Sequence, residues 1–474
     1  MNRRELLKSL GLGTAASVAG LPQFSSLEAA EEVRGRVNTN SEPSKLRITD
    51  LRLVPMIGEM RSHVIRLETN QGLCGYGEVR DAASSTYALM LKSRVLGENP
   101  CHVDRIFRKL KQFGGHGRQA GGVVAIEMAC WDLAGKAWGV PCWQMLGGKF
   151  RDKIRLYVDT PTRRNPQEMG QRLKERRERG FSFLKMDIGL GLLRDVEGAL
   201  TYPHGPASDL SRQSRGGFSQ NIRHPFTGIR ITDKGLAALQ TYVRQVRDTV
   251  GWDIPIAADH FGHIGVEDAI KLAQTLDPFN LAWLEDLIPW DYPDDYVRIR
   301  DACKTPLLTG EDIYLKEGFM PLFEKKAIAI CHPDLATAGG LLETKKIGDL
   351  AMEHGINMAM HMAGSPILLL ASVHCAAATE NFLALEFHDA DTAYYESLVD
   401  GIPKPFMDKD GFIPVPDSPG LGVTLNEDAV KDMLRRNGRD PEKLYFPPSN
   451  EWNQERSHDR LWSQYPNIKS APSA

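Results

Sequence analysis

Six ionisable residues recur along the chain at nearly equal intervals, each at the end of a short apolar segment. Successive members are separated by 26, 26, 23, 27 and 25 residues, about the length of one strand-plus-helix unit. In a parallel barrel, the carboxyl ends of successive strands open into one mouth, so these side chains would meet there although they are distant in sequence. The six residues are Asp259, Glu285, Glu311, Asp334, His361 and Glu386.

The first three of these residues have the chemistry of a divalent-cation site. Asp259, Glu285 and Glu311 follow three consecutive candidate strands. A surface charge or a helix cap would explain any one of them alone, but not three in register. Because Mg²⁺ prefers hard carboxylate oxygens, the sequence predicts Mg²⁺ as the cofactor.

A candidate base lies earlier in the chain. Lys185 lies in the strand-like segment FLKMDIG, and Asp187 follows two residues later. Lysine at a strand end can also reach outward to solvent, which is the structural alternative. Next to Mg²⁺ and in a low-dielectric surrounding, we expect the pKa of Lys185 to be lowered, so that its amine acts as a base.

These residues need a scaffold of alternating strands and helices. Short apolar segments alternate with amphipathic ones, which predicts a parallel sheet, and eight repeats predict a closed (β/α)₈-type barrel in an α/β protein. About sixty-five residues separate the second and third strands, so residues 190–230 form an insertion, interpreted as a lid, an oligomer contact or a loop without a role. The predicted strands are 154–160, 183–189, 254–262, 281–287, 306–312, 327–336, 356–362 and 382–389.

Other segments flank the barrel. Residues 46–150 alternate like strands and then like helices, which predicts an α+β capping domain with a lead-in helix. Residues 151–400 would form the barrel, and residues 401–474 would pack back on the cap. Residues 1–30 contain Arg3-Arg4 and a short apolar stretch, typical of a twin-arginine export signal, and 31–45 read as a linker. We therefore expect a periplasmic or otherwise exported protein.

The charge composition gives no reason to expect nucleic acid or a membrane surface as a partner. Net charge is −3, from 58 basic and 61 acidic residues, so nothing favours binding to nucleic acid or to an anionic membrane. We therefore expect neither nucleic acid nor a membrane as a partner.

Longer motifs carry a family resemblance. The segment AIEMACWDLAGKAWGVPCWQMLGG, the run PDLATAGGLLETKKI and the acids of WLED and LLTGED resemble the enolase superfamily, with the mandelate racemase-like branch fitting best. HMAGSPILLLASVHCAAATENF and FLKMDIG look most similar to acid-sugar dehydratases of the galactonate dehydratase type. The resemblance covers roughly residues 46–430, and it rests on the order and spacing of the motifs.

The resemblance implies a role for each strand-end residue. The implied Mg²⁺ ligands are Asp259, Glu285 and Glu311. The implied catalytic residues are Lys185, His361, Asp334 and Glu386. His361 and Asp334 would form a dyad in which the carboxylate orients the imidazole and raises its basicity. Glu386 would hydrogen-bond the substrate carboxylate or enolate, for which it must be protonated or paired.

The general acid is left open by the stretch PIAADHFGHIG. The family commonly has a histidine two residues after its first metal-binding Asp, and here that position is Phe261, between His260 and His263. Strand alternation sends His260 away from the mouth unless a bulge turns it, whereas His263 could reach back from a loop. We expect one of the two to donate a proton. A zinc site on both is the alternative, although carboxylates complete it poorly.

Specificity is expected from the capping domain and the strand ends. In the family, the loop corresponding to MIGEMRSH closes over the mouth, and Asp187 places a further carboxylate there. The candidate contacts to a polyhydroxylated chain are Glu59, Arg61 and His63. The insertion adds His204, Arg223 and His224.

The resemblance implies that the reaction is dehydration of a small-molecule substrate, a sugar acid. A base removes the proton α to the carboxylate, and loss of the β-hydroxyl as water gives a 2-keto-3-deoxy acid. Racemisation, epimerisation or lactone cycloisomerisation would use the same enolate chemistry and are alternatives. An exported sugar-acid-binding protein without catalysis is an alternative of another class. The resemblance also implies a homo-oligomer.

Overall fold

The computed structural model describes residues 42–58, 60–193, 195–201, 230–260 and 264–455. The export signal, most of the linker and most of the insertion lie outside these ranges and stay predictions. So do the proposed roles of Glu59, His263, His204, Arg223 and His224. Within the described ranges, no helix has both the length and the apolar character that a bilayer crossing requires.

The capping domain is a three-stranded antiparallel sheet covered by helices. The sheet order is β1-β2-β3, with β1 at Ile48–Met56, β2 at Ser62–Thr69 and β3 at Cys74–Val79. Helix α6 packs on this sheet and is buried along nearly its whole length, including its acidic residues Glu127 and Asp132. The helices of the capping domain are α3 (Thr86–Leu89), α4 (Lys92–Val95), α5 (Val103–Leu110), α6 (Gly121–Trp138) and α7 (Cys142–Met145).

Glycines set the close approach of α6 to the sheet. A Cβ atom at Gly77 of β3 would lie 1.9 Å from the carbonyl oxygen of Ala125. A Cβ atom at Gly75 would lie 2.3 Å from the carbonyl oxygen of Ala129. Only glycine permits this contact between strand and helix backbones.

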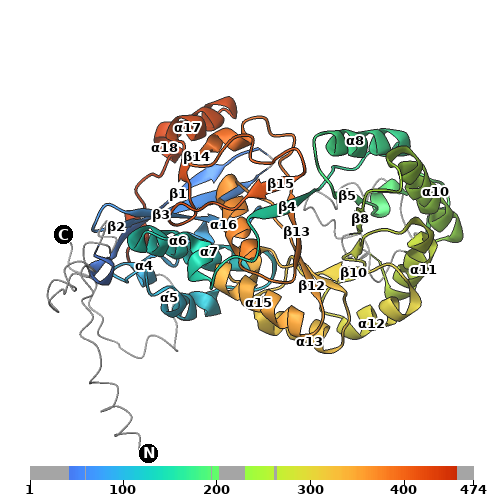
Figure 1. Cartoon of the computed structure of the whole chain (residues 1–474), viewed down its shortest axis with the longest axis horizontal. Helices are drawn as coiled ribbons and strands as arrows, with labels where there is room; N and C mark the ends of the chain where they lie inside the picture. The colour runs from blue at the N-terminus through green and yellow to red at the C-terminus, as the bar shows by residue number, and fades with distance from the viewer. Residues whose placement is uncertain (1–41, 59, 194, 202–229, 261–263, 456–474) are drawn as a thin grey trace, which may run out of the picture. The chain divides into compact units, whose positions relative to one another are not determined.

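Eight parallel strands close into a barrel, because the last strand pairs with the first (Figure 1). This confirms the predicted fold class, a (β/α)₈-type barrel with an α+β cap. The barrel strands are β4 (Lys153–Val158), β5 (Leu184–Asp187), β8 (Ile256–Asp259), β9 (Leu284–Glu285), β10 (Leu307–Thr309), β11 (Ile330–Cys331), β12 (Asn357–Met360) and β13 (Phe382–Phe387). The connecting helices are α8 (Pro166–Glu178), α10 (Asp233–Val250), α11 (Val266–Leu276), α12 (Pro293–Ala302), α13 (Leu315–Glu324), α14 (Leu335–Ala338), α15 (Leu341–Glu353) and α16 (Pro366–Ala377).

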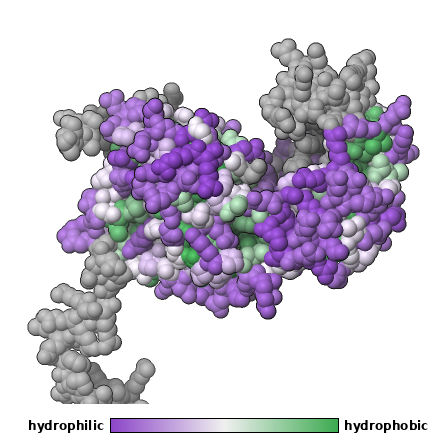
Figure 2. Space-filling view, turned by 90° about the horizontal axis from the view of Figure 1, so that it is seen from above, coloured by the Kyte–Doolittle hydropathy of each residue, from purple (hydrophilic) through white to green (hydrophobic). Residues whose placement is uncertain are grey.

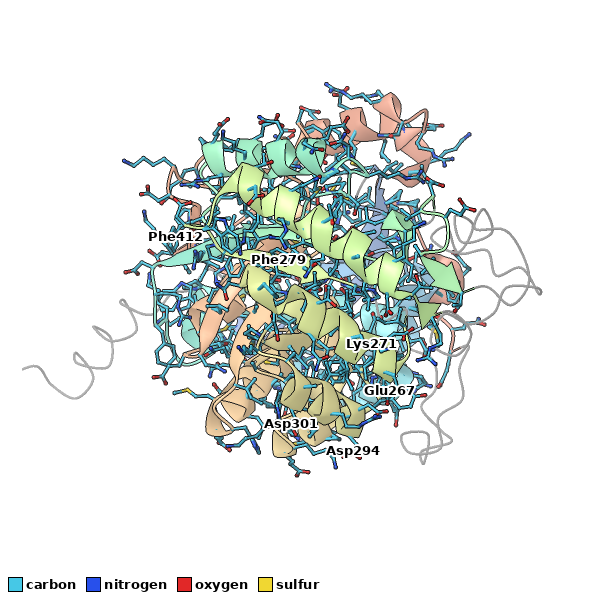
Figure 3. The ribbon with its side chains drawn as sticks, turned by 90° about the vertical axis from the view of Figure 1, so that its right-hand side faces the viewer. Glu267, Lys271, Phe279, Asp294, Asp301 and Phe412 are labelled. Carbon is cyan, nitrogen blue, oxygen red and sulfur yellow. The ribbon has the colours of Figure 1, made fainter. Side chains whose placement is uncertain are left out.

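The connecting helices bury one face on the barrel and turn charged residues outward. On α11, Leu272 and Leu276 are buried, while Glu267 and Lys271 are exposed. Figure 3 shows Glu267 and Lys271 on the outer side of α11, with Asp294 on the neighbouring α12. In the face drawn in Figure 2, hydrophilic residues cover most of the surface. This is the amphipathic pattern from which the barrel helices were predicted.

The barrel interior begins with an apolar layer that draws one side chain from each strand or from the residue just before it. These side chains form a cluster separate from the main core between strands and helices. Such a layer makes the barrel a packed core and gives the strand ends above it a rigid base. Its members are Tyr157, Phe183, Ala257, Trp283, Leu308, Ile330, Ala359 and Ala384.

The C-terminal segment returns to the cap, which completes the predicted fold. Strand β15 pairs antiparallel with β4, and the ring centroid of Phe446 lies 6.4 Å from that of Tyr76 on β3. The backbone N–H of Leu421 donates to Asp132 on α6. The segment contains β14 (Val399–Asp400), β15 (Phe412–Pro414), β16 (Thr424–Leu425), α17 (Glu427–Arg436) and α18 (Pro441–Leu444). The insertion is flanked by β6 (Leu200–Thr201) and β7 (Arg230–Ile231).

Candidate active site

A charged layer lies directly above the apolar layer of the barrel. Alternation along a strand returns every second side chain to the same face, so the residues two positions further on form the next interior layer. Seven of these eight positions hold ionisable residues, so the barrel interior changes from apolar to charged at its carboxyl end. The eight positions are Asp159, Lys185, Asp259, Glu285, Gly310, His332, His361 and Glu386.

Glu311 reaches this layer because Gly310 breaks the alternation. Gly310 has φ of +142°, and a Cβ atom there would lie 2.6 Å from the ring of Phe319. With this irregularity, the carboxylate of Glu311 turns into the mouth, where Oε2 lies 3.1 Å from Nε2 of His361. Only glycine fits the backbone conformation that places this acid.

Lys185 lies in the centre of the charged layer and is 2% exposed. Its Nζ is 2.6 Å from Oε1 of Glu386, 3.2 Å from Oε1 of Glu285 and 3.4 Å from Oδ2 of Asp259. Burial alone lowers the pKa of Lys185, but these carboxylates outweigh it and raise the pKa well above its ordinary value. The chain's own residues therefore raise the pKa of Lys185, contrary to the expected lowering, because three carboxylates surround its amine.

The three predicted metal ligands lie on adjacent strands. Asp259 and Glu285 are register partners on β8 and β9. The ligand atoms of Glu285, Glu311 and His332 lie within 4.8 Å of one another, so this group contains two of the three predicted ligands, with His332 in place of Asp259. Burial and the charge of Glu285 raise the pKa of Asp259 well above its ordinary value. Buried carboxylates that repel one another suit a hard divalent cation, so the donor set fits Mg²⁺.

His332 supports this acidic group from the barrel interior. Its Nδ1 is 2.9 Å from the carbonyl oxygen of Ala359, and its Nε2 is 3.2 Å from Oε1 of Glu285. Burial would raise the pKa of Glu285, but Lys185 and His332 lower it to about 2. The Nε1–H of Trp283 also donates to Glu285. Glu285 is therefore a fixed, ionised carboxylate.

The predicted dyad is present, and a third residue joins it. Nδ1 of His361 lies 2.5 Å from Oδ2 of Asp334, and their backbones form a parallel bridge. Asp334 is completely buried, and Oδ1 accepts from the N–H of Ala336 at 2.6 Å as the N-cap of α14. Arg80, which follows β3 of the cap, donates to the same Asp334 carboxylate, and its Nη1 is 2.9 Å from Nδ1 of His361. The cap thus contributes directly to the barrel site.

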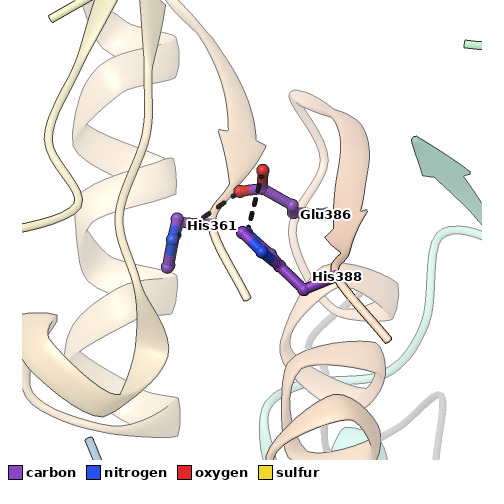
Figure 4. A group of neighbouring side chains, drawn as sticks. All are labelled: His361, Glu386 and His388. Carbon is purple, nitrogen blue, oxygen red and sulfur yellow. Dashed lines mark ion pairs between the residues drawn. The ribbon is translucent and has the colours of Figure 1, made fainter. Parts of the chain in front are cut away.

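Glu386 is paired. It is completely buried, and Oε1 lies next to Lys185. Oε1 is also 3.3 Å from Nε2 of His388, and Oε2 is 3.9 Å from Nε2 of His361. Figure 4 shows the two histidines next to this carboxylate. Burial would raise the pKa of Glu386, but Lys185 and the histidines lower it well below its ordinary value. Of the two predicted states of this acid, protonated or paired, the geometry matches the paired one.

A second pair of acids lies on the β4 and β5 side of the mouth. Asp187 ends β5 and accepts from the hydroxyl of Thr162 at 2.9 Å. Burial and the nearby Asp159 raise the pKa of Asp187 to about 7. The predicted extra carboxylate in the mouth therefore changes its charge close to neutral pH.

The remaining predicted candidates are positioned less directly. Arg61 is exposed with φ of +42°, and His63 lies on β2 opposite Val79 of β3. Their loop reaches the barrel end, because the hydroxyl of Tyr394 donates to the carbonyl oxygen of Ile57 at 3.2 Å. His260 is completely buried and lies two residues after Ala258, whose side chain packs in the main core outside the barrel interior. Because side chains two residues apart on a strand lie on the same face, His260 also points away from the mouth.

Four site residues were absent from the sequence prediction. Asp159, His332 and His388 follow the same two-residue alternation as the residues that were predicted, so the pattern contained them. Arg80 had no comparable indication, because it comes from the cap and contacts a residue 254 positions away.

Comparison with known proteins places the chain in a family. Residues 168–429 match the sequence model described as Enolase C-terminal domain-like, and residues 35–147 match the N-terminal domain of mandelate racemase and muconate lactonizing enzyme. The chain therefore belongs to the mandelate racemase/muconate lactonizing enzyme branch of the enolase superfamily, whose members generally use Mg²⁺.

Individual relatives agree with this assignment. A D-xylonate dehydratase of Haloferax volcanii is 34% identical over 396 residues, covering 81% of this chain and 88% of the relative. A D-galactonate dehydratase of Klebsiella pneumoniae is 27% identical, covering 82% and 94%. The crystal structure of a mandelate racemase/muconate lactonizing enzyme-like protein from Rubrobacter xylanophilus has a TM-score of 0.69 and 29% identity, covering 82% and 98%. The resemblance to acid-sugar dehydratases is confirmed.

Proposed function

We propose that the chain is a Mg²⁺-dependent dehydratase of a sugar acid, a hydro-lyase that converts an aldonic acid into a 2-keto-3-deoxy acid. The observation that carries this proposal is the charged layer at the barrel mouth, where Lys185 and His361 lie on either side of Glu386. A lysine amine and an imidazole stand there beside a set of carboxylates that fits a divalent cation. The dehydratase names of two relatives support the same reaction class.

The acids of β8, β9 and β10 would hold the ion. When bound, Mg²⁺ supplies positive charge beside the substrate carboxylate and beside the acids that otherwise keep Lys185 protonated. The proposed ligands are Asp259, Glu285 and Glu311.

Lys185 and His361 are the two candidates for removing the α-proton. Because Asp334 lies next to Nδ1 of His361, Nε2 is the nitrogen left to take or return a proton at the mouth. Arg80 and the N–H of Ala336 hold the Asp334 carboxylate in place. Lys185 is held by Glu386 from the next strand but one. The chain therefore fixes both bases on a rigid barrel end.

The test is a screen of five- and six-carbon aldonates, beginning with D-xylonate and D-galactonate, for keto-acid product. Product should form with Mg²⁺ and disappear when EDTA is in excess over the ion. Incubation in deuterated water should also show exchange at the α-carbon. If no acid in the screen gives a keto product with Mg²⁺, the dehydratase proposal is wrong.

The same experiment separates the alternatives. An α-epimer or a rearranged lactone without keto acid would identify a racemase, epimerase or cycloisomerase. Binding of an aldonate without α-proton exchange would identify a binding protein.

We also propose export through the twin-arginine route and assembly into a homo-oligomer. Replacing Arg3 and Arg4 by lysine should keep the protein inside the cell, which fractionation measures. Light scattering of the full chain should give a multiple of 52.8 kDa, less any cleaved signal. Export of the double variant, or a monomer mass, would contradict the respective proposal.

A further inference from the structure

One charged side chain at the mouth has no part in the proposed proton abstraction. His388 follows β13 directly, two residues beyond Glu386, so alternation turns it toward the same mouth. Its side chain is 31% exposed, whereas those of Lys185 and His361 are 2% and 6% exposed. His388 therefore lies one layer closer to solvent than the two bases.

The surroundings of His388 favour a protonated imidazole. Nε2 is 3.3 Å from Oε1 of Glu386, and Nδ1 is 3.5 Å from Oδ2 of Asp159. Its ring centroid is 5.5 Å from that of His361. Figure 4 shows both imidazoles next to Glu386. Burial lowers the pKa of His388, but Glu386 and Asp159 outweigh burial and the opposing charge of Lys185, and raise the pKa to about 9.

Dehydration needs a proton donor for the oxygen that leaves. Hydroxide is a poor leaving group, so the β-hydroxyl must be protonated as its bond to carbon breaks. Two other described histidines are poorly placed to donate this proton. His260 points toward the core outside the barrel, and His332 is completely buried beneath the mouth. His263 lies outside the described residues. His388 combines exposure, charge and proximity to His361.

We propose that His388 is the general acid that converts the β-hydroxyl into water, an inference that rests on the proposed dehydratase function. Lys185 or His361 takes the α-proton, and the electron pair of the broken C–H bond passes into the enolate. That pair forms the new Cα–Cβ double bond as the Cβ–O bond breaks. The leaving oxygen keeps the electron pair of its bond and takes the proton of His388, giving water and an enol. The enol tautomerises to the 2-keto-3-deoxy acid, and solvent reprotonates His388.

The central test is His388→Asn, measured on whichever of D-xylonate and D-galactonate the wild-type enzyme dehydrates. Keto-acid formation should fall at least 10²-fold, which is typical for loss of a general acid. Exchange of the α-proton in deuterated water should stay within about 10-fold of wild type, because the bases remain. Loss of both activities to the same extent, or loss of neither, would overturn the inference.

A fluorinated substrate separates proton donation from a structural role. Fluoride leaves without needing a strong acid, so the 3-deoxy-3-fluoro analogue of the same aldonate should be converted by His388→Asn nearly as fast as by wild type. If His388 only shapes the site, the variant will lose both substrates equally, and the inference fails.

A milder variant keeps the test valid if His388→Asn does not fold. Asp159→Asn removes one carboxylate that raises the pKa of His388, while Glu386 remains, together with Lys185, Asp187 and His361 nearby. Because the acid must be protonated, the alkaline limb of the kcat profile should move to lower pH. An unmoved limb counts against His388. Absence of α-proton exchange and of keto product in the wild type would instead reject the proposed function itself.

Discussion

Lys185 is the residue whose surroundings depend most on the proposed chemistry. Three carboxylates from three other strands converge on one buried amine. Lys185→Met keeps the length of the side chain and removes its charge and its basicity. If Lys185 is the base, kcat should fall by 10²-fold or more, and α-proton exchange should fall with it. Exchange that persists at the wild-type rate would assign proton removal to His361.

A buried lysine in the cap gives a matched control. Lys92 is 1% exposed and lies 2.5 Å from Asp50, far along the chain from the barrel acids. Lys92→Met should lower the melting temperature, because it leaves a half-buried carboxylate with one fewer partner. Turnover per folded molecule should be unchanged, in contrast to Lys185→Met.

Arg80 connects the cap to the dyad through its planar fork of donors. It is completely buried and lies against Asp81, Glu311 and Asp334. Arg80→Lys keeps the charge but cannot reach these acids simultaneously. We expect kcat to fall about 10- to 100-fold with a smaller change in KM. Arg66→Lys, which alters a half-buried cap arginine over the ring of Phe446, is the control and should leave kcat within about twofold. Equal effects of both variants would contradict a positioning role.

At the residue scale, spacing predicted the strand-end residues, but not the complete layer. The interval of 23 to 27 residues identified positions such as Glu285 and Glu386 because each strand has to end at the same rim. His332 was missed because Asp334, two residues later, had already been assigned as the functional residue of this strand end. Side-chain alternation along a strand allows both residues to face the mouth. Glu311 entered the mouth through the positive φ of Gly310, which spacing alone does not reveal.

At the scale of elements, the cap holds barrel helices by their N-termini. Glu127 on α6 accepts the N–H groups of Leu341 and Leu342 in the first turn of α15. Glu78 on β3 likewise accepts the N–H groups of Ser365 and Leu368 at the start of α16. These bonds satisfy backbone N–H donors that the first turn of a helix leaves unpaired. Sequence periodicity predicted these helices, but it could not predict caps supplied from more than 200 residues away.

Glu127 should make the stability of the protein depend on pH. Burial raises its pKa to about 8, although the N–H groups of Leu341, Leu342 and Trp131 oppose this. The folded value lies above the ordinary 4.5, so the stabilising contribution is complete below pH 4.5 and is lost as pH rises through 8. Glu127→Gln does not titrate, so its deficit in unfolding free energy should shrink by on the order of 1–3 kcal/mol across this window.

Denaturant unfolding at pH 5, 6.5 and 8 measures this deficit. Glu68→Gln, which removes a partly exposed partner of Arg66, is the control and should give a nearly constant difference from wild type. A constant difference for Glu127→Gln as well would contradict a raised pKa.

At the scale of the whole molecule, the proposed ion would stabilise the fold, because its ligands come from three strands that unfolding separates. A ligand at 100 times its Kd that binds only the folded state adds about 2.7 kcal/mol. For a protein of this size, that corresponds to a rise of about 3 °C in melting temperature. Calorimetry with Mg²⁺ and with EDTA measures this shift without substrate or turnover. Glu311→Gln should abolish it, whereas Asp312→Asn, which removes the same charge one residue further on where the side chain pairs with Arg118, should retain it. Equal Mg²⁺ shifts in both variants would place the ion outside these three strands, and the role proposed for Lys185 would have to be argued without a neighbouring cation.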